Sequence, residues 1–215
     1  MKRISLIALT MVALGVPSSA AARQFVRTVD NPWFPLKPGS VWRYRGVKDG
    51  KRTRDVVRVS GRTKKIRGVR VTAVSDRLYL AGRLEERTTD WYAQDTRGNV
   101  WYFGEATAEL DRHGRVKTRE GSWQAGVNGA KAGIFMPANP RPGQTGRQEF
   151  LRGHAEDHFK VLRRTRNALL TKEWTPLEPG VIDHKRYRYG VGTVLELTVK
   201  GGDERNVLVS FKAGS

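Results

Sequence analysis

The segment from Asp90 to Glu105 constrains the fold more than any other stretch of this chain. It reads DWYAQDTRGNVWYFGE, so two runs rich in aromatic residues flank the short run DTRGN at residues 95–99. Aromatic residues favour β-strands, whereas Asp, Gly and Asn favour tight turns. The segment therefore predicts a β-hairpin, and with it a protein in which antiparallel strands are joined by short turns.

The same pattern recurs along the rest of the chain. Short runs rich in Val, Thr, Tyr and Trp are separated by further turn signals at residues 48–51, 112–115 and 201–204. No stretch of eleven or more residues carries the apolar period of a helix. We expect a mainly β protein, built as a single antiparallel meander that forms a barrel, a half-barrel or a sandwich.

Two segments do not fit regular strands. Residues 30–39 contain three prolines, which excludes a central strand, and we expect Trp33 and Phe34 to plug one end of the core. Residues 121–146 are rich in Gly and Pro but also contain Trp123 and the apolar run at 134–136. Because long loops are commonly functional or disordered, these apolar side chains predict a packed lid loop here.

The first 22 residues have the pattern of a secretory signal peptide. Two basic residues precede a 13-residue apolar run at 4–16, and small residues at 20–22 offer a cleavage site. A membrane-spanning helix needs about 20 apolar residues, so an uncleaved anchor is the weaker alternative. We expect a secreted, periplasmic or cell-envelope protein whose mature chain, residues 23–215, is one β-rich domain without a transmembrane segment.

The chain contains no cysteine. A lipid anchor on a cysteine and a stabilising disulfide are therefore both excluded, although an exported protein could form the latter. Stability must come from the packed core alone.

Several longer runs resemble a family of uncharacterised exported bacterial β-rich proteins. The opening NPWFPLKPGSVW at 31–42 matches the Asn-Pro-aromatic-Phe-Pro-Leu-x-Pro-Gly motif with which their mature chains begin. The similarity continues through residues 90–95, 99–105, 121–130, 133–138, 147–150, 155–157 and 175–180, and so covers nearly the whole mature chain. The resemblance implies secretion and a shared fold. It implies no particular activity, and the histidines at 154 and 158 are not part of the pattern.

The chain is strongly basic, with 40 Lys and Arg against 21 Asp and Glu and a formal net charge of +19. Such a charge attracts polyanions, which outside the cell are envelope polymers, lipid headgroups and extracellular DNA rather than a specific nucleic acid. The candidate polyanion-binding residues, called the basic set below, are Arg54, Arg58, Lys64, Lys65 and Arg67. The alternative is that these residues only keep exposed strand faces soluble.

The aromatic residues of the hairpin are candidates for a ligand pocket. Tyr92, Trp101, Tyr102 and Trp123 could stack against a saccharide-like or other planar ligand. Consecutive aromatic residues on a strand point to opposite faces, so one set belongs to the core in any case. The alternative is that all of them only fill the core.

Hairpin register suggests a carboxyl pair. A two-residue loop at 97–98 would place Asp90 opposite Glu105, on the face carrying Tyr92 and Phe103. Opposed like charges are destabilising unless a proton or a cation is shared, and a carboxyl with a raised pKa can serve as a general acid, as in glycosidases. The alternative is a solvated hairpin end.

The run HAEDH at 154–158 is a candidate metal site. On a strand, His154, Glu156 and His158 would share one face, and two imidazoles with a carboxylate suit Zn²⁺. Same-face neighbours lie about 7 Å apart, which strains a compact site, so the alternative is a polar solvent face. We predict no cofactor. Nucleophile-elbow, Walker and Gly-x-Gly-x-x-Gly motifs are absent from the sequence.

Three functions remain open. The preferred one is a non-catalytic, monomeric binding module for an apolar, saccharide-like or anionic envelope ligand. The others are a hydrolase that depends on a metal or on the carboxyl pair, and a structural or folding-assistance protein of the envelope.

Overall fold

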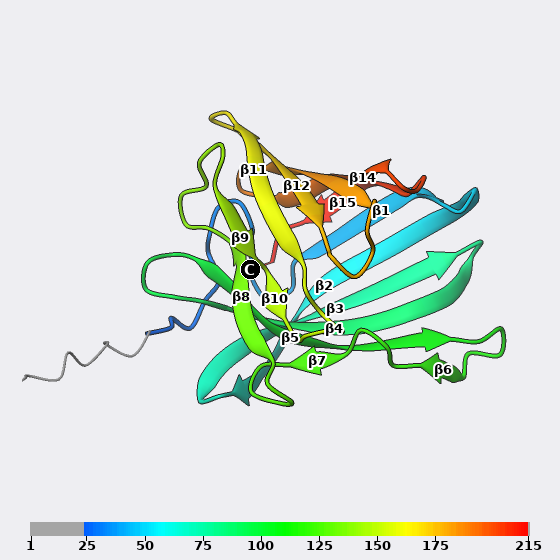
Figure 1. The fold of residues 1–215 in the computed structure, drawn as a ribbon, viewed down its shortest axis with the longest axis horizontal. Coiled ribbons are helices and arrows are strands. Elements are labelled where there is room, and N and C mark those ends of the chain that lie inside the picture. Colours follow the sequence, from blue (N-terminus) through cyan, green and yellow to red (C-terminus); the bar gives the residue numbers. More distant parts are fainter. Residues whose placement is uncertain (1–23, 215) are drawn as a thin grey trace, which may run out of the picture.

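The computed structural model describes residues 24–214, and the predicted leader lies outside them. Over these residues the chain forms fifteen strands and no helix, and all the strands belong to one antiparallel sheet that is nearly closed into a barrel (Figure 1). The mainly β, antiparallel prediction is confirmed. No helix in the described part of the chain is long and apolar enough to cross a membrane.

The strands are long in the first half of the chain and shorter in the second. In chain order they are β1 (Val41–Lys48), β2 (Lys51–Ile66), β3 (Val69–Leu80), β4 (Arg83–Gln94), β5 (Val100–Leu110), β6 (Val116–Thr118), β7 (Trp123–Gln124), β8 (Lys131–Met136), β9 (Thr145–Arg147), β10 (Glu149–Phe150), β11 (His158–Arg164), β12 (Ala168–Trp174), β13 (Ile182–Arg188), β14 (Gly192–Lys200) and β15 (Arg205–Lys212).

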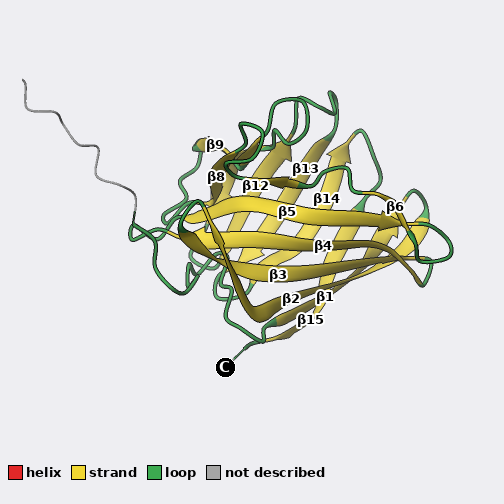
Figure 2. Cartoon of the chain, turned by 90° about the horizontal axis from the view of Figure 1, so that it is seen from below, coloured by secondary structure: helices red, strands yellow, loops and turns green. Residues whose placement is uncertain are grey.

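Two meanders make up the wall. In the first, β1 to β5 pair in sequence, and in the second, β11 to β15 do the same. The last strand, β15, then pairs with β1, which joins the two meanders into one sheet. Figure 2 shows β5 to β1 and β15 side by side across the near wall, with β12 to β14 behind them. Side chains that point inward from the two meanders therefore face each other.

A single short segment connects the two edges of the nearly closed barrel. Strand β9 pairs with β11 and strand β10 pairs with β8, and only Gln148 separates β9 from β10. Gly133 of β8 allows this segment to approach closely, because a Cβ there would lie 2.3 Å from the Arg147 carbonyl oxygen. Residues 145–150 thus bridge the two edges of the sheet, which no continuous ladder joins.

The two irregular segments both pack against the barrel. Within residues 121–146, strands β7 and β8 pair with β5, so this segment extends the wall and Trp123 and Met136 are buried. In the proline-rich segment, Trp33 is 1% exposed, as expected of a plug. Asn31 fixes that segment by donating its side-chain N–H to the Gly98 and Pro137 carbonyls.

The hairpin has the predicted strands, and Asp90 lies opposite Glu105 as predicted. The loop is longer than two residues, however, because Asp95 organises it by accepting the backbone N–H groups of Arg97 and Asn99. Tyr92 consequently pairs with Tyr102, and the prediction that it shares a face with Phe103 is wrong. A bulge between the Tyr92 and Trp91 pairs then shifts the pairing by one residue, so that Asp90 lies opposite Glu105.

Gly104 makes this bulge possible. Its φ is 130°, in the region that side chains disfavour, and a Cβ there would lie 2.3 Å from the Trp123 carbonyl oxygen.

Candidate ligand-binding cavity

The barrel contains a half-open cavity of about 280 Å³ that is lined from both meanders and from the proline-rich segment. Side chains alternate between the two faces of each strand, and this alternation determines which residues line the cavity. On β2, for example, Asp55 and Val57 point inward while Val56 between them points outward. Six aromatic residues line the cavity: Phe34, Trp42, Tyr44, Tyr92, Tyr102 and Phe135. Seven carboxyl side chains line it as well: Asp55, Asp76, Asp90, Glu105, Glu149, Asp157 and Glu196. An interior of this composition is unusual in a chain whose net charge is strongly positive.

The aromatic side of the cavity is a packed cluster. The rings of Tyr92 and Tyr102 stack with their centroids 4.8 Å apart. Phe135 lies edge-on to Tyr92 at 5.2 Å, and Phe34 of the proline-rich segment lies 4.6 Å from Phe135. Because each ring is held by at least one other, this wall is preorganised for an apolar or planar group.

A first cluster of carboxyl side chains, Asp90, Glu105 and Glu149, lies beside the aromatic cluster. The Tyr102 hydroxyl donates to Asp90 Oδ1 at 2.7 Å. Burial, reinforced by the nearby Asp76, raises the pKa of Asp90 to about 7, and burial with the charge of Asp90 raises the pKa of Glu105 to about 9. Burial also raises the pKa of Glu149 to about 8. Around neutral pH these carboxyls therefore hold protons that exposed carboxyls would have lost.

A second cluster of carboxyl side chains, Asp55 and Asp76, lies on the neighbouring strands β2 and β3 of the same wall. Burial raises the pKa of Asp55 and raises that of Asp76 well above its usual range, and the charge of Asp55 raises the latter further. The two side chains hydrogen-bond to each other, so they share a proton, and Glu196 acts on both through its charge. No N–H or hydroxyl donor of the described chain reaches Asp55 Oδ1, which is buried.

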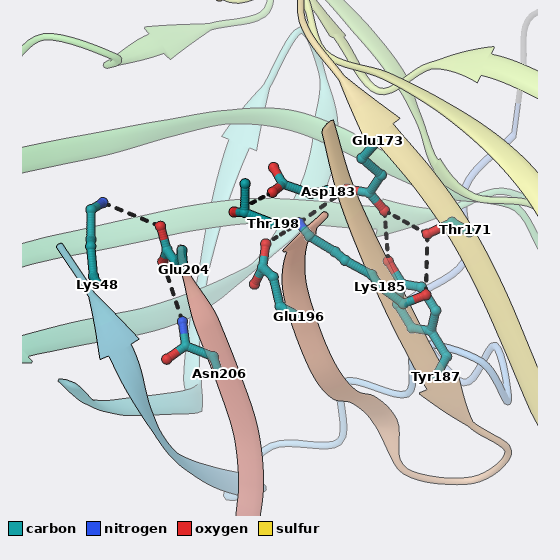
Figure 3. A network of polar contacts seen from close by, with 10 residues as sticks. All are labelled: Lys48, Thr171, Glu173, Asp183, Lys185, Tyr187, Glu196, Thr198, Glu204 and Asn206. Atoms are coloured by element: carbon teal, nitrogen blue, oxygen red, sulfur yellow. Dashed lines mark hydrogen bonds and ion pairs between the residues drawn. The ribbon is translucent and has the colours of Figure 1, made fainter. Parts of the chain in front are cut away.

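Lys185 is the only cation among the residues that line the cavity, and it is fully engaged (Figure 3). Its Nζ lies 3.0 Å from Glu173 Oε2 and 3.0 Å from Glu196 Oε1. Burial lowers the pKa of this ammonium, but the two carboxylates outweigh burial and raise it well above its usual value. Glu173 is further fixed by the hydroxyls of Thr171 and Tyr187, at 2.9 and 3.1 Å.

More polar contacts continue this network along the inner wall. Asn206 donates to Glu204 at 3.3 Å, and Lys48 forms an ion pair with Glu204 at 3.5 Å (Figure 3). Asn206 also accepts the Thr53 hydroxyl at 3.0 Å. These groups satisfy one another. The amide of Gln148 differs, because this residue is 4% exposed, lines the cavity, and its Nε2 has no hydrogen-bond partner in the described chain.

The structure divides the four predicted pocket aromatics into two pairs. Tyr92 and Tyr102 line the cavity, whereas Trp101 and Trp123 do not. Trp101 points to the other face of β5, where its indole N–H donates to Asp95 Oδ2 at 2.9 Å. Trp123 is buried behind Tyr102, edge-on at 5.3 Å. These two tryptophans are not part of this cavity, although Trp101 borders a second hollow beside β8 and β9.

The arrangement predicted for the histidine run is also wrong. His154 lies in a turn closed by hydrogen bonds between Leu151 and Ala155, so residues 154–158 are not one strand. Glu156 accepts the Gly153 N–H at 2.7 Å, and His158 stacks on Trp174 with ring centroids 5.5 Å apart. Across residues 24–214, no group of three or more His, Asp or Glu side chains is arranged to hold a metal ion.

The basic set lies outside the barrel, on β2 and the turn after it, and all five residues are exposed. Some of them pack on neighbouring aromatic residues. The Arg54 guanidinium lies 3.8 Å from the Tyr79 ring centroid, and Lys64 Nζ lies 3.8 Å from the centroid of a Trp91 ring. The molecule thus has a basic outer wall around an acidic interior.

Six charged residues of the cavity were not predicted from the sequence: Asp55, Asp76, Glu149, Asp157, Lys185 and Glu196. The only signal that could have found them is their position on the same strand face as buried neighbours, such as Asp55 between Thr53 and Val57. Comparisons with protein-family models, with curated proteins and with solved structures gave no match.

Proposed function

We propose that this protein is an exported, non-catalytic binding protein whose interior cavity takes up a small molecule. The observation that carries the proposal is the cavity itself, which has a volume of about 280 Å³, an aromatic wall and polar groups of the chain that no protein partner satisfies. Protein interiors are otherwise close-packed, so a hollow of this kind at the centre of a barrel is the default location of a ligand. Export follows from the predicted leader.

The cavity and the outer wall differ in charge, so they favour different classes of ligand. Seven carboxyls and a single ammonium line the cavity, and this disfavours an anionic ligand inside the barrel. An anionic envelope polymer would instead meet the basic set on the outer wall. A weak, salt-sensitive contact of that kind would hold the protein near the envelope without occupying the cavity.

A pair of adjacent substitutions on β2 tests this proposal. Val57 lines the cavity and Val56 faces outward, so Val57→Phe should fill the cavity and Val56→Phe should not. We expect a thermal-shift screen of small molecules of differing charge to yield compounds that stabilise the wild type and Val56→Phe but not Val57→Phe. A ligand present at 100 times its Kd stabilises by about 2.7 kcal/mol, which such a screen resolves.

Two results would contradict a binding cavity: no stabilising compound at all, or compounds whose effect survives in Val57→Phe. In either case the cavity would be only a structural feature of the barrel.

One observation favours a second candidate function, acid–base hydrolysis. Asp90 and Glu105 are directly opposed, and their pKa values are raised to about 7 and about 9, so the pair could supply a general acid at neutral pH. Chromogenic glycosides test this candidate. Turnover that is lost in both Asp90→Asn and Glu105→Gln would support it, and its absence in the wild type would leave the binding function alone.

A further inference from the structure

The charges in the cavity are not balanced by the chain. The Lys185 ammonium is shared by two carboxylates, Glu173 and Glu196, which leaves one negative charge in excess. The hydrogen-bonded pair of Asp55 and Asp76 keeps a second negative charge when it shares one proton. Uncompensated charge inside a protein costs free energy, so a cationic group that entered the cavity would be favoured.

A second, independent observation points to a ligand in the same place. The Gln148 amide is 96% buried, borders the cavity, and has no partner for its Nε2. Buried amide N–H groups almost always have an acceptor, and leaving one without an acceptor costs free energy. A ligand oxygen in the cavity would satisfy this donor, which a simple metal ion or ammonium ion could not.

The size and the aromatic wall limit what the cation can be. A cavity of about 150 Å³ holds a benzene ring, so about 280 Å³ accommodates one ring with a short chain. The stacked pair of Tyr92 and Tyr102, with Phe135 across from it, offers faces and edges to a planar ring. Aromatic faces also attract cations, which reinforces the carboxyls.

We propose that the cavity binds a small organic cation: an aromatic amine with one ring, a short chain ending in an ammonium group, and a hydroxyl or carbonyl oxygen. The ring lies against Tyr92, Tyr102 and Phe135. The ammonium group pairs with Asp55, Asp76 and Glu196, and the oxygen accepts the Gln148 amide. This inference rests on the proposed function, because it names the ligand class of the same cavity.

Three probes that differ mainly in charge test the inference by calorimetry. Tyramine is cationic at neutral pH, tyrosol replaces its amine by a neutral hydroxyl, and 4-hydroxyphenylacetate carries a carboxylate instead. We expect tyramine to bind at least about tenfold more tightly than tyrosol, and 4-hydroxyphenylacetate not to bind, because a single charge pair in a protein exceeds the 1.4 kcal/mol of a tenfold change.

Two variants locate the effect. Glu196→Gln removes a cavity carboxylate while Lys185 keeps its ion pair with Glu173, and it should weaken tyramine by about tenfold while leaving tyrosol unchanged. The matched control is Glu120→Gln, which removes a carboxyl from an exposed turn and should change neither affinity. Circular dichroism of each variant verifies the fold.

The outcomes separate this inference from the proposed function. If tyrosol or 4-hydroxyphenylacetate binds as tightly as tyramine, and the binding is lost in Val57→Phe, the cavity binds ligands but the cationic class is wrong. If tyramine binds equally well to Glu196→Gln, the placement of the ammonium group is wrong. If none of the three binds, the inference is overturned, and the thermal-shift screen decides the function on its own.

Discussion

Removing one interior carboxyl should stabilise this protein at alkaline pH, and Glu105→Gln is the sharpest case. Burial, the charge of Asp90 and the charge of Glu149 raise the pKa of Glu105 from 4.5 to about 9. Between these two values the folded state holds a proton that the unfolded state has lost. The stability that Glu105 contributes is therefore greatest at acid pH and falls as the pH rises toward 9.

The magnitude follows from this difference in proton binding. One proton changes the free energy of unfolding by about 1.4 kcal/mol per pH unit, so from pH 5 to pH 8 Glu105 accounts for at most about 4 kcal/mol. Water in the cavity screens part of this effect, and we expect about 2 kcal/mol. Since glutamine does not titrate, Glu105→Gln should match the wild type at pH 5 and exceed it by about 2 kcal/mol, or roughly 4–8 °C in Tm, at pH 8.

Urea unfolding followed by tryptophan fluorescence at pH 5, 6, 7 and 8 measures this difference. The control is Glu109→Gln on the same strand, where the carboxyl is 43% exposed and pairs with Lys117, and we expect a change within about 0.5 kcal/mol at every pH. A Glu105→Gln variant that is less stable than the wild type at pH 8, or whose advantage does not depend on pH, would refute the electrostatic description of the interior.

Three further predictions concern the ion pairs, the closing segment and the outer wall. Lys185→Met should cost about 2–3 kcal/mol in urea unfolding at pH 7 because it leaves the buried Glu173 and the partly exposed Glu196 unpaired, whereas the exposed Lys160→Met should be neutral, and equal effects would contradict the network. Gly133→Ala should cost on the order of 1–3 kcal/mol because its Cβ would meet the Arg147 carbonyl oxygen, whereas Gly61→Ala, with open space around it, should not. Neutralising three residues of the basic set should lower the salt concentration that elutes the protein from heparin more than neutralising three basic residues in the 160–166 region; equal shifts would show that only net charge matters.

The hairpin at residues 90–105 was predictable from the sequence only in part. The composition of residues 90–105 was enough to predict its strands, because turn chemistry and strand propensity are local properties. The opposition of Asp90 and Glu105 was predicted from a two-residue loop, and it holds because the longer loop and the bulge offset each other. The bulge was not predictable, because it depends on Gly104 lying against the backbone of Trp123, in a segment that is distant along the chain. For the same reason, the sequence did not predict that Tyr92 and Tyr102 share a face.

The acidic interior could not be predicted from the sequence, for a different physical reason. Along a strand, alternation separates two faces but does not say which of them is interior, and charged residues normally mark the solvent side. Asp55 and Lys185 therefore looked like surface residues. Only closure of the sheet, through the segment at 145–150 that bridges its edges, brings them together with Glu196 around one space. The strand predicted for the histidine run at 154–158 was wrong because local turn hydrogen bonds form there instead.

The most direct test of the account is where a ligand binds. Two cavity-lining residues, Gln148 and Asn206, carry side-chain amides whose resonances report on the interior, while Asn167 lies in an exposed turn outside it. In a ¹⁵N–¹H correlation spectrum titrated with tyramine, we predict saturable shifts at Gln148 and Asn206 and none at Asn167. Shifts confined to exposed amides such as Asn167, with the two interior amides unmoved, would contradict a ligand-binding cavity.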